Sequence, residues 1–71
     1  YLGKEIAIKT EYLWKQNHKL PINVVLGDEW HAGNLSYHLN SRPVWEGLIT
    51  KDKLNSLSKF ICIDNICVGN R

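Results

Sequence analysis

The chain has 71 residues, of which 44% are hydrophobic and 23% are charged, with a formal net charge of +2 at pH 7. This composition excludes a disordered tail, and the small, dispersed charge gives no reason to expect nucleic acid as a partner. The apolar runs are only a few residues long, which excludes a membrane span within the chain. A chain of this length buries only about 60% of its unfolded surface, so we expect marginal stability without a covalent link or a partner.

The first element is predicted to be a helix over residues 2–17. Pro21 prevents its continuation. Residues 22–26, INVVL, follow as a strand that is almost continuously apolar, which is typical of a strand covered on both faces. The apolar face of the helix is predicted from residues at helical spacing, namely Leu2, Ile6, Leu13 and Trp14.

A second helix is predicted from a cap at Asp28 to about Leu39. Aspartate is a preferred N-cap, and Glu29 adds negative charge where the helix dipole favours it. Gly33 inside this helix costs about 1 kcal/mol relative to alanine. We expect a close approach of the helix to the sheet to explain this glycine.

The rest of the chain is predicted to form a strand, a short helix and a hairpin. Residues 43–45 form the strand, with a proline at its start. Residues 51–57 form the helix, with Thr50 as its N-cap. Two β-branched apolar runs then flank Asp64 and Asn65, which tolerate positive φ and predict a two-residue turn.

The predicted order of elements is αβαβαββ. A strand–helix–strand unit implies a right-handed crossover and a parallel pair. The predicted class is therefore α/β, with a small sheet that is parallel at its core, a C-terminal antiparallel hairpin and helices packed against it. Residues 1–71 are interpreted as one small domain. Because the chain lacks methionine and begins at Tyr1 within a helix-like pattern, we expect a piece excised from a longer protein.

The two cysteines, Cys62 and Cys67, are predicted to face each other across the hairpin. The pair beside a two-residue turn is hydrogen-bonded, so the next pair is a non-hydrogen-bonded one with closer side chains. Two alternatives stay open: a disulfide formed in an oxidising compartment, or two buried free thiols. A metal site is not expected, because no second cysteine pair or suitably spaced histidine pair accompanies them.

Two groups of side chains are candidates for chemistry. Asp28 and His31, with Glu29 and His38, suggest a site at the end of a strand, although capping already explains the aspartate. Aromatic faces stack on sugar rings, but more often they form core or interface. Five aromatic residues are candidates for such a platform, namely Tyr12, Trp14, Trp30, Tyr37 and Trp45.

No catalytic residue and no cofactor are predicted. Arg42, before a proline, is a candidate for binding a phosphate or a carboxylate. The predicted binding residues are Asp28, Trp30, His31, Arg42 and Trp45.

The segment from Ala32 to Pro43, AGNLSYHLNSRP, with the preceding INVVLGD, resembles a region of bacterial membrane glycosyltransferases. These are the relatives of protein O-mannosyltransferases and lipid A aminoarabinose transferases. The similarity covers residues 22–45, about a third of the chain, and it departs from the family pattern at His38 and at residues 40–41. The region that it resembles is the soluble C-terminal part of those enzymes.

The resemblance implies an accessory domain on the periplasmic side of a bacterial inner membrane. Such enzymes transfer a sugar from a polyprenyl-phosphate donor, and their catalytic carboxylates lie in another part of the protein. The implied partners are the transmembrane part of the same chain and a lipid-linked sugar or its acceptor, and the piece alone is expected to be inactive. The alternative is a small α/β module that recognises a sugar or a peptide through aromatic residues.

Overall fold

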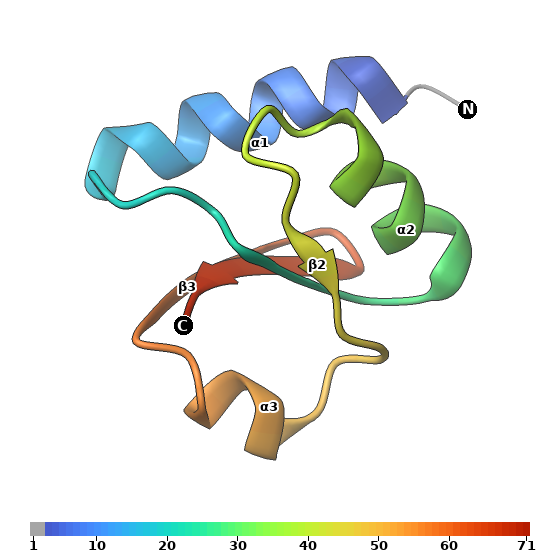
Figure 1. Cartoon of the computed structure of the whole chain (residues 1–71), viewed down its shortest axis with the longest axis vertical. Helices are drawn as coiled ribbons and strands as arrows, with labels where there is room; N and C mark the ends of the chain where they lie inside the picture. Colours follow the sequence, from blue (N-terminus) through green and yellow to red (C-terminus); the bar gives the residue numbers. More distant parts are fainter. Residues whose placement is uncertain (1–2) are drawn as a thin grey trace.

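The computed structural model describes residues 3–71. Three helices and four strands follow one another in the predicted order (Figure 1). Their bounds are α1 Gly3–Asn17, β1 Val24–Leu26, α2 Glu29–His38, β2 Val44–Trp45, α3 Lys51–Asn55, β3 Lys59–Ile63 and β4 Ile66–Asn70. The first helix was predicted to include Leu2, which lies outside the described residues.

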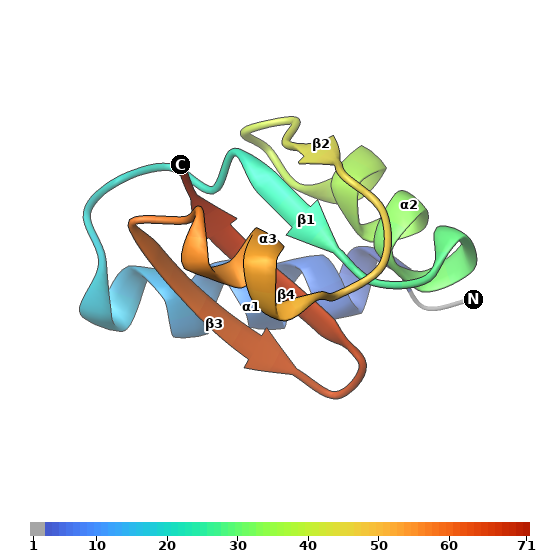
Figure 2. The ribbon, with the colours of Figure 1, turned by 90° about the horizontal axis from the view of Figure 1, so that it is seen from below.

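The four strands form one sheet between two helical layers. The sheet order is β2-β1-β4-β3, with β1 and β2 parallel and the other pairs antiparallel. Helices α1 and α2 cover one face and α3 lies on the other (Figures 1 and 2). The predicted α/β class, the parallel strand–helix–strand unit and the C-terminal hairpin are therefore confirmed.

The central strand β1 separates two hydrophobic clusters. Val25 is in the larger cluster with buried residues of α1 and α2, whereas Val24 and Leu26 are in the smaller one with Leu57. Successive side chains of a strand point to opposite faces of a sheet. The three residues of β1 are all buried, which confirms that this strand is covered on both faces.

Trp14 joins α1 to the start of β1. Its ring is 1% exposed, and its Nε1 donates a hydrogen bond to the carbonyl oxygen of Leu20 at 2.5 Å. The indole also lies against His18, with the ring centroids 4.2 Å apart. This one side chain thus fixes the connection that follows the helix.

Three predicted elements are shorter in the structure. Strand β1 begins at Val24 rather than Ile22, and β2 begins at Val44 rather than Pro43. Helix α3 ends at Asn55 because the backbone tightens there: the N–H of Ser56 bonds to carbonyls three and four residues back. Leu57 is still buried against the sheet, although it lies beyond the helix.

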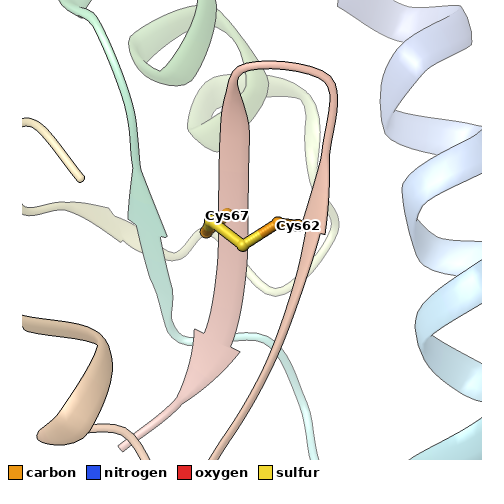
Figure 3. The surroundings of a disulfide bond; sticks show 2 residues. All are labelled: Cys62 and Cys67. Carbon is orange, nitrogen blue, oxygen red and sulfur yellow. A yellow bond between two sulfur atoms is a disulfide. The ribbon is translucent and has the colours of Figure 1, made fainter. Parts of the chain in front are cut away.

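The C-terminal hairpin has the predicted register. Cys62 pairs with Cys67 and Ile63 with Ile66, and Asp64 in the turn has a φ of 54°. The cysteines form a disulfide with an S–S distance of 2.02 Å, on the face of the sheet that carries α3 (Figure 3). The disulfide alternative is confirmed and the free-thiol alternative is wrong.

Candidate functional site

An open groove runs between α2 and the edge strand β2, which lie side by side in Figure 1. Three aromatic rings line it, two from the helix and one from the strand. The remaining lining residues are a carboxylate, an amide and a glycine. The full lining is Glu29, Trp30, Gly33, Asn34, Tyr37 and Trp45.

Helical spacing brings Trp30 and Tyr37 to the same face of α2. They are seven residues apart, which is two turns or about 10.5 Å along the helix axis. The opposite stripe of the helix is buried in the core through Ala32 and Leu35. The two rings are 62% and 66% exposed, respectively. Burial of one stripe therefore directs two large aromatic side chains to solvent.

Trp45 forms the strand side of the groove. It is half-buried against the main core, and its Nε1 donates a hydrogen bond to the carbonyl oxygen of Gly27 at 2.8 Å. The parallel pairing of β1 with β2 sets Trp45 opposite Val25, and this register fixes the position of Trp45 along the strand direction. The hydrogen bond and the core contacts hold the Trp45 ring in place, whereas the rings of Trp30 and Tyr37 are largely exposed to solvent.

Arg42 lies over the ring of Tyr37, at the end of α2. Its guanidinium carbon is 5.1 Å from the ring centroid, which is a cation–π distance. The residue has a φ of 50°, in the left-handed region, in the turn before β2. Arg42 thus contacts a groove residue rather than lining the groove itself.

The expected reason for Gly33 is wrong. A Cβ built on this residue meets no atom within 4 Å, apart from its chain neighbours and its own helix backbone, in the described structure. Its backbone is not in the positive-φ region that requires glycine. Gly33 therefore faces the open groove instead of a closely packed sheet.

Two polar side chains also line the groove. Glu29 is exposed, and its carboxylate is an acceptor at the start of the groove. The side-chain nitrogen of Asn34 donates to the carbonyl oxygen of Trp30 at 2.5 Å, which orients the amide. The amide oxygen of Asn34 and the carboxylate are two acceptors suited to hydroxyl donors.

Asp28 and His31 form a pair at the start of α2 but do not line the groove. The backbone N–H of His31 donates to Asp28 Oδ1 at 2.8 Å, which confirms Asp28 as the N-cap. The ring Nδ1 lies 2.8 Å from Oδ2 of the same carboxylate. The hydrogen bond from the backbone, followed by that from the imidazole, holds the pKa of Asp28 below its ordinary value of 3.8.

The cap at Asp28 predicts an acid-dependent contribution to stability. Because the folded pKa is depressed, the contribution is present above the unfolded pKa and is lost as pH falls through the folded pKa. Asp28→Asn retains a cap that does not titrate. We expect urea unfolding to show a smaller loss of stability between pH 7 and about pH 2 in this variant. Equal acid dependence in the two proteins would contradict the assignment.

The structure brings together three of the five aromatic candidates, and the platform itself stays a prediction. Trp30, Tyr37 and Trp45 come together, but Trp14 is buried in the core and Tyr12 is exposed on α1, outside the groove. His31 lines a different hollow of about 240 Å³ between α1, α2 and the hairpin. The groove also contains Glu29 and Tyr37, which were candidates outside the final set of predicted binding residues, and Gly33 and Asn34, which were not candidates.

No family model, no curated protein and no solved structure matches this chain. In residues 3–71 there is no group of three or more histidine, cysteine or acidic residues arranged to hold a metal ion. No helix of the described chain is both long enough and apolar enough to cross a membrane.

Proposed function

We propose that the chain is an accessory domain of a bacterial integral-membrane glycosyltransferase, on the extracytoplasmic side of the inner membrane. The parent enzyme would use a sugar linked to polyprenyl phosphate. The domain would contact the transmembrane part of its own chain and either the lipid-linked sugar or the acceptor. The resemblance of residues 22–45 is the reason for proposing this family, and the Cys62–Cys67 disulfide is the structural observation that supports the proposed compartment.

The position of the disulfide supports an oxidising environment. Cys62 is exposed, so the bond is open to small thiols, whereas Cys67 is 2% exposed. Cytosolic proteins rarely keep such bonds, because the glutathione and thioredoxin systems maintain thiols in the reduced form. An accessible disulfide is therefore more consistent with the periplasm than with the cytoplasm.

Several hydroxyl and carboxylate side chains of the domain have structural partners, which supports a non-catalytic role. The hydroxyl groups of Ser36, Ser41 and Ser58 each donate to a backbone carbonyl. The carboxylate of Asp28 is used in capping α2. A nucleophile activated by a neighbouring base needs a different geometry.

The cellular state of the cysteines tests this proposal. Cells that express the full-length protein are quenched in acid, and the denatured protein is treated with a maleimide of high mass, with and without prior reduction. We expect modification of Cys62 and Cys67 only after reduction. Two modified thiols without reduction would contradict the compartment. An upstream coding sequence without membrane helices would contradict the membrane parent.

The second candidate function is a binding module that recognises a sugar or a peptide through aromatic residues. The observation in its favour is that Trp30, Tyr37 and Trp45 line one groove beside acceptor groups. Binding of the labelled domain to an array of glycans and peptides tests it, with Trp30→Ala as the comparison. We expect wild-type protein to retain a subset of ligands that the variant loses. An array on which wild-type protein retains nothing would contradict this candidate.

A further inference from the structure

Gly33 has no explanation within the fold. An alanine there would meet open space, and the backbone conformation does not require glycine. Alanine would also stabilise the helix, because glycine loses more conformational freedom on folding. The chain therefore retains a helix-weakening residue at a position where neither packing nor backbone geometry calls for it.

The place of Gly33 in the groove supplies a reason. It lies on α2 between Trp30 and Tyr37, and all three line the groove. A side chain at this position would project into the space between the two rings. The backbone of α2 at Gly33 forms the floor of the groove. Because Gly33 has no Cβ, a flat ligand can approach this backbone between the rings of Trp30 and Tyr37.

The chemistry of the lining favours a carbohydrate over a peptide or a lipid. Aromatic faces pack on the C–H face of a sugar ring, while Glu29 and Asn34 provide acceptors for hydroxyl groups. A lipid would require a more continuous apolar surface. A peptide that adds to the sheet edge would find a strand of only two residues, Val44–Trp45.

The charges near the groove favour a neutral ligand. Glu29 lies at the start of α2, and Arg42 lies over Tyr37 at the other end. The two opposite charges do not select a strongly anionic or cationic ligand. A neutral sugar can stack on the aromatic rings and donate hydroxyl hydrogen bonds to the acceptors. It also needs no net charge in the groove.

We propose that Gly33 is the floor of a carbohydrate subsite, in which a neutral pyranose ring lies over α2 between Trp30 and Tyr37. This inference rests on the second function proposed above and adds its ligand class and a residue that determines specificity. Gly33 acts by leaving space, and Trp30 and Tyr37 provide the contacts.

The variant Gly33→Ala tests the inference through two measurements that move in opposite directions. We expect its melting temperature to rise by about 4 °C. The added methyl group is expected to weaken binding of trisaccharides by about tenfold or more. The probes are cellotriose, mannotriose and triacetylchitotriose, and the readouts are differential scanning calorimetry and isothermal titration calorimetry.

A matched pair of tyrosine variants controls for surface effects. Tyr12 and Tyr37 are exposed helical tyrosines, at 64% and 66%, but only Tyr37 lines the groove. Tyr37→Ala is expected to weaken trisaccharide binding, whereas Tyr12→Ala is expected to leave it unchanged. Equal losses in the two variants would overturn the assignment of the groove.

The outcomes separate this inference from the function on which it rests. If wild-type protein binds a trisaccharide and Gly33→Ala binds it equally well, the floor role is overturned and the sugar-binding function stands. If wild-type protein binds none of the three probes, both are overturned. A lower melting temperature for Gly33→Ala would show that the fold itself needs the glycine, and this would also overturn the inference.

Discussion

Replacing Trp14 by alanine is expected to lower the free energy of unfolding by about 3–5 kcal/mol. The side chain is 1% exposed and belongs to the main core cluster, so its removal leaves a large cavity. It also removes the hydrogen bond from α1 to the carbonyl oxygen of Leu20, in the connection to β1. A domain of this size has little stability to spare. We therefore expect most Trp14→Ala molecules to be unfolded at 25 °C.

Urea denaturation followed by circular dichroism measures this effect. Trp14→Phe retains much of the ring but leaves the Leu20 carbonyl without its donor, so we expect a smaller loss of about 1–3 kcal/mol. Tyr12→Ala removes an exposed aromatic side chain of the same helix and is expected to change stability by less than about 0.5 kcal/mol. A Trp14→Ala variant as stable as Tyr12→Ala would contradict the assigned core.

Removing the disulfide is expected to be the second large effect. The bond closes a loop with a sequence separation of five, and loop-closure entropy predicts a contribution of about 2 kcal/mol to stability. The pairing already has the favoured cross-strand geometry, because Cys62 lies opposite Cys67 in the hairpin register. For a chain of this length the corresponding fall in melting temperature is about 10 °C.

Comparison of oxidised protein, reduced protein and the double variant Cys62→Ala/Cys67→Ala isolates the contribution of the bond. We expect reduction to lower the urea midpoint of the wild-type protein and to leave that of the double variant unchanged. The double variant controls for effects of the reductant on other groups. If oxidised and reduced wild-type protein unfold at the same urea concentration, the bond does not stabilise the fold.

Local sequence signals were sufficient for the hairpin and for the start of α2. Asp64 and Asn65 fix a two-residue turn, and the turn sets the register that brings the cysteines together. Asp28 specifies the helix start because its carboxylate satisfies a backbone N–H that has no partner within the helix. These features depend on residues close in the chain, so the sequence predicts them well.

The groove depends on contacts between distant residues, which the sequence does not specify. The buried stripe of α2 implies that Trp30 and Tyr37 face outward. Trp45 joins them only because β1 pairs with β2 in a particular register. Nor does the sequence show that β4 inserts between β1 and β3. Strand order follows from the packing of the whole chain.

The role of Gly33 also depends on tertiary contacts that the sequence does not specify. A glycine within a helical pattern fits a close approach of backbones and an open surface equally well. Only the tertiary structure separates these two cases, and here it shows open space. Trp14 and Trp30 are likewise the same residue type on helices that pack against the sheet, yet they are 1% and 62% exposed. Their difference depends on which helical face meets the sheet.

The most direct test of the groove as a carbohydrate site is an NMR titration that follows the three indole N–H signals. Trp30 and Trp45 line the groove, whereas Trp14 is buried in the core and provides an internal reference. On addition of the three trisaccharides, we expect the Trp30 and Trp45 signals to shift with at least one sugar while the Trp14 signal stays in place. If all three signals stay in place at saturating sugar, or if all three move together, the carbohydrate site is contradicted.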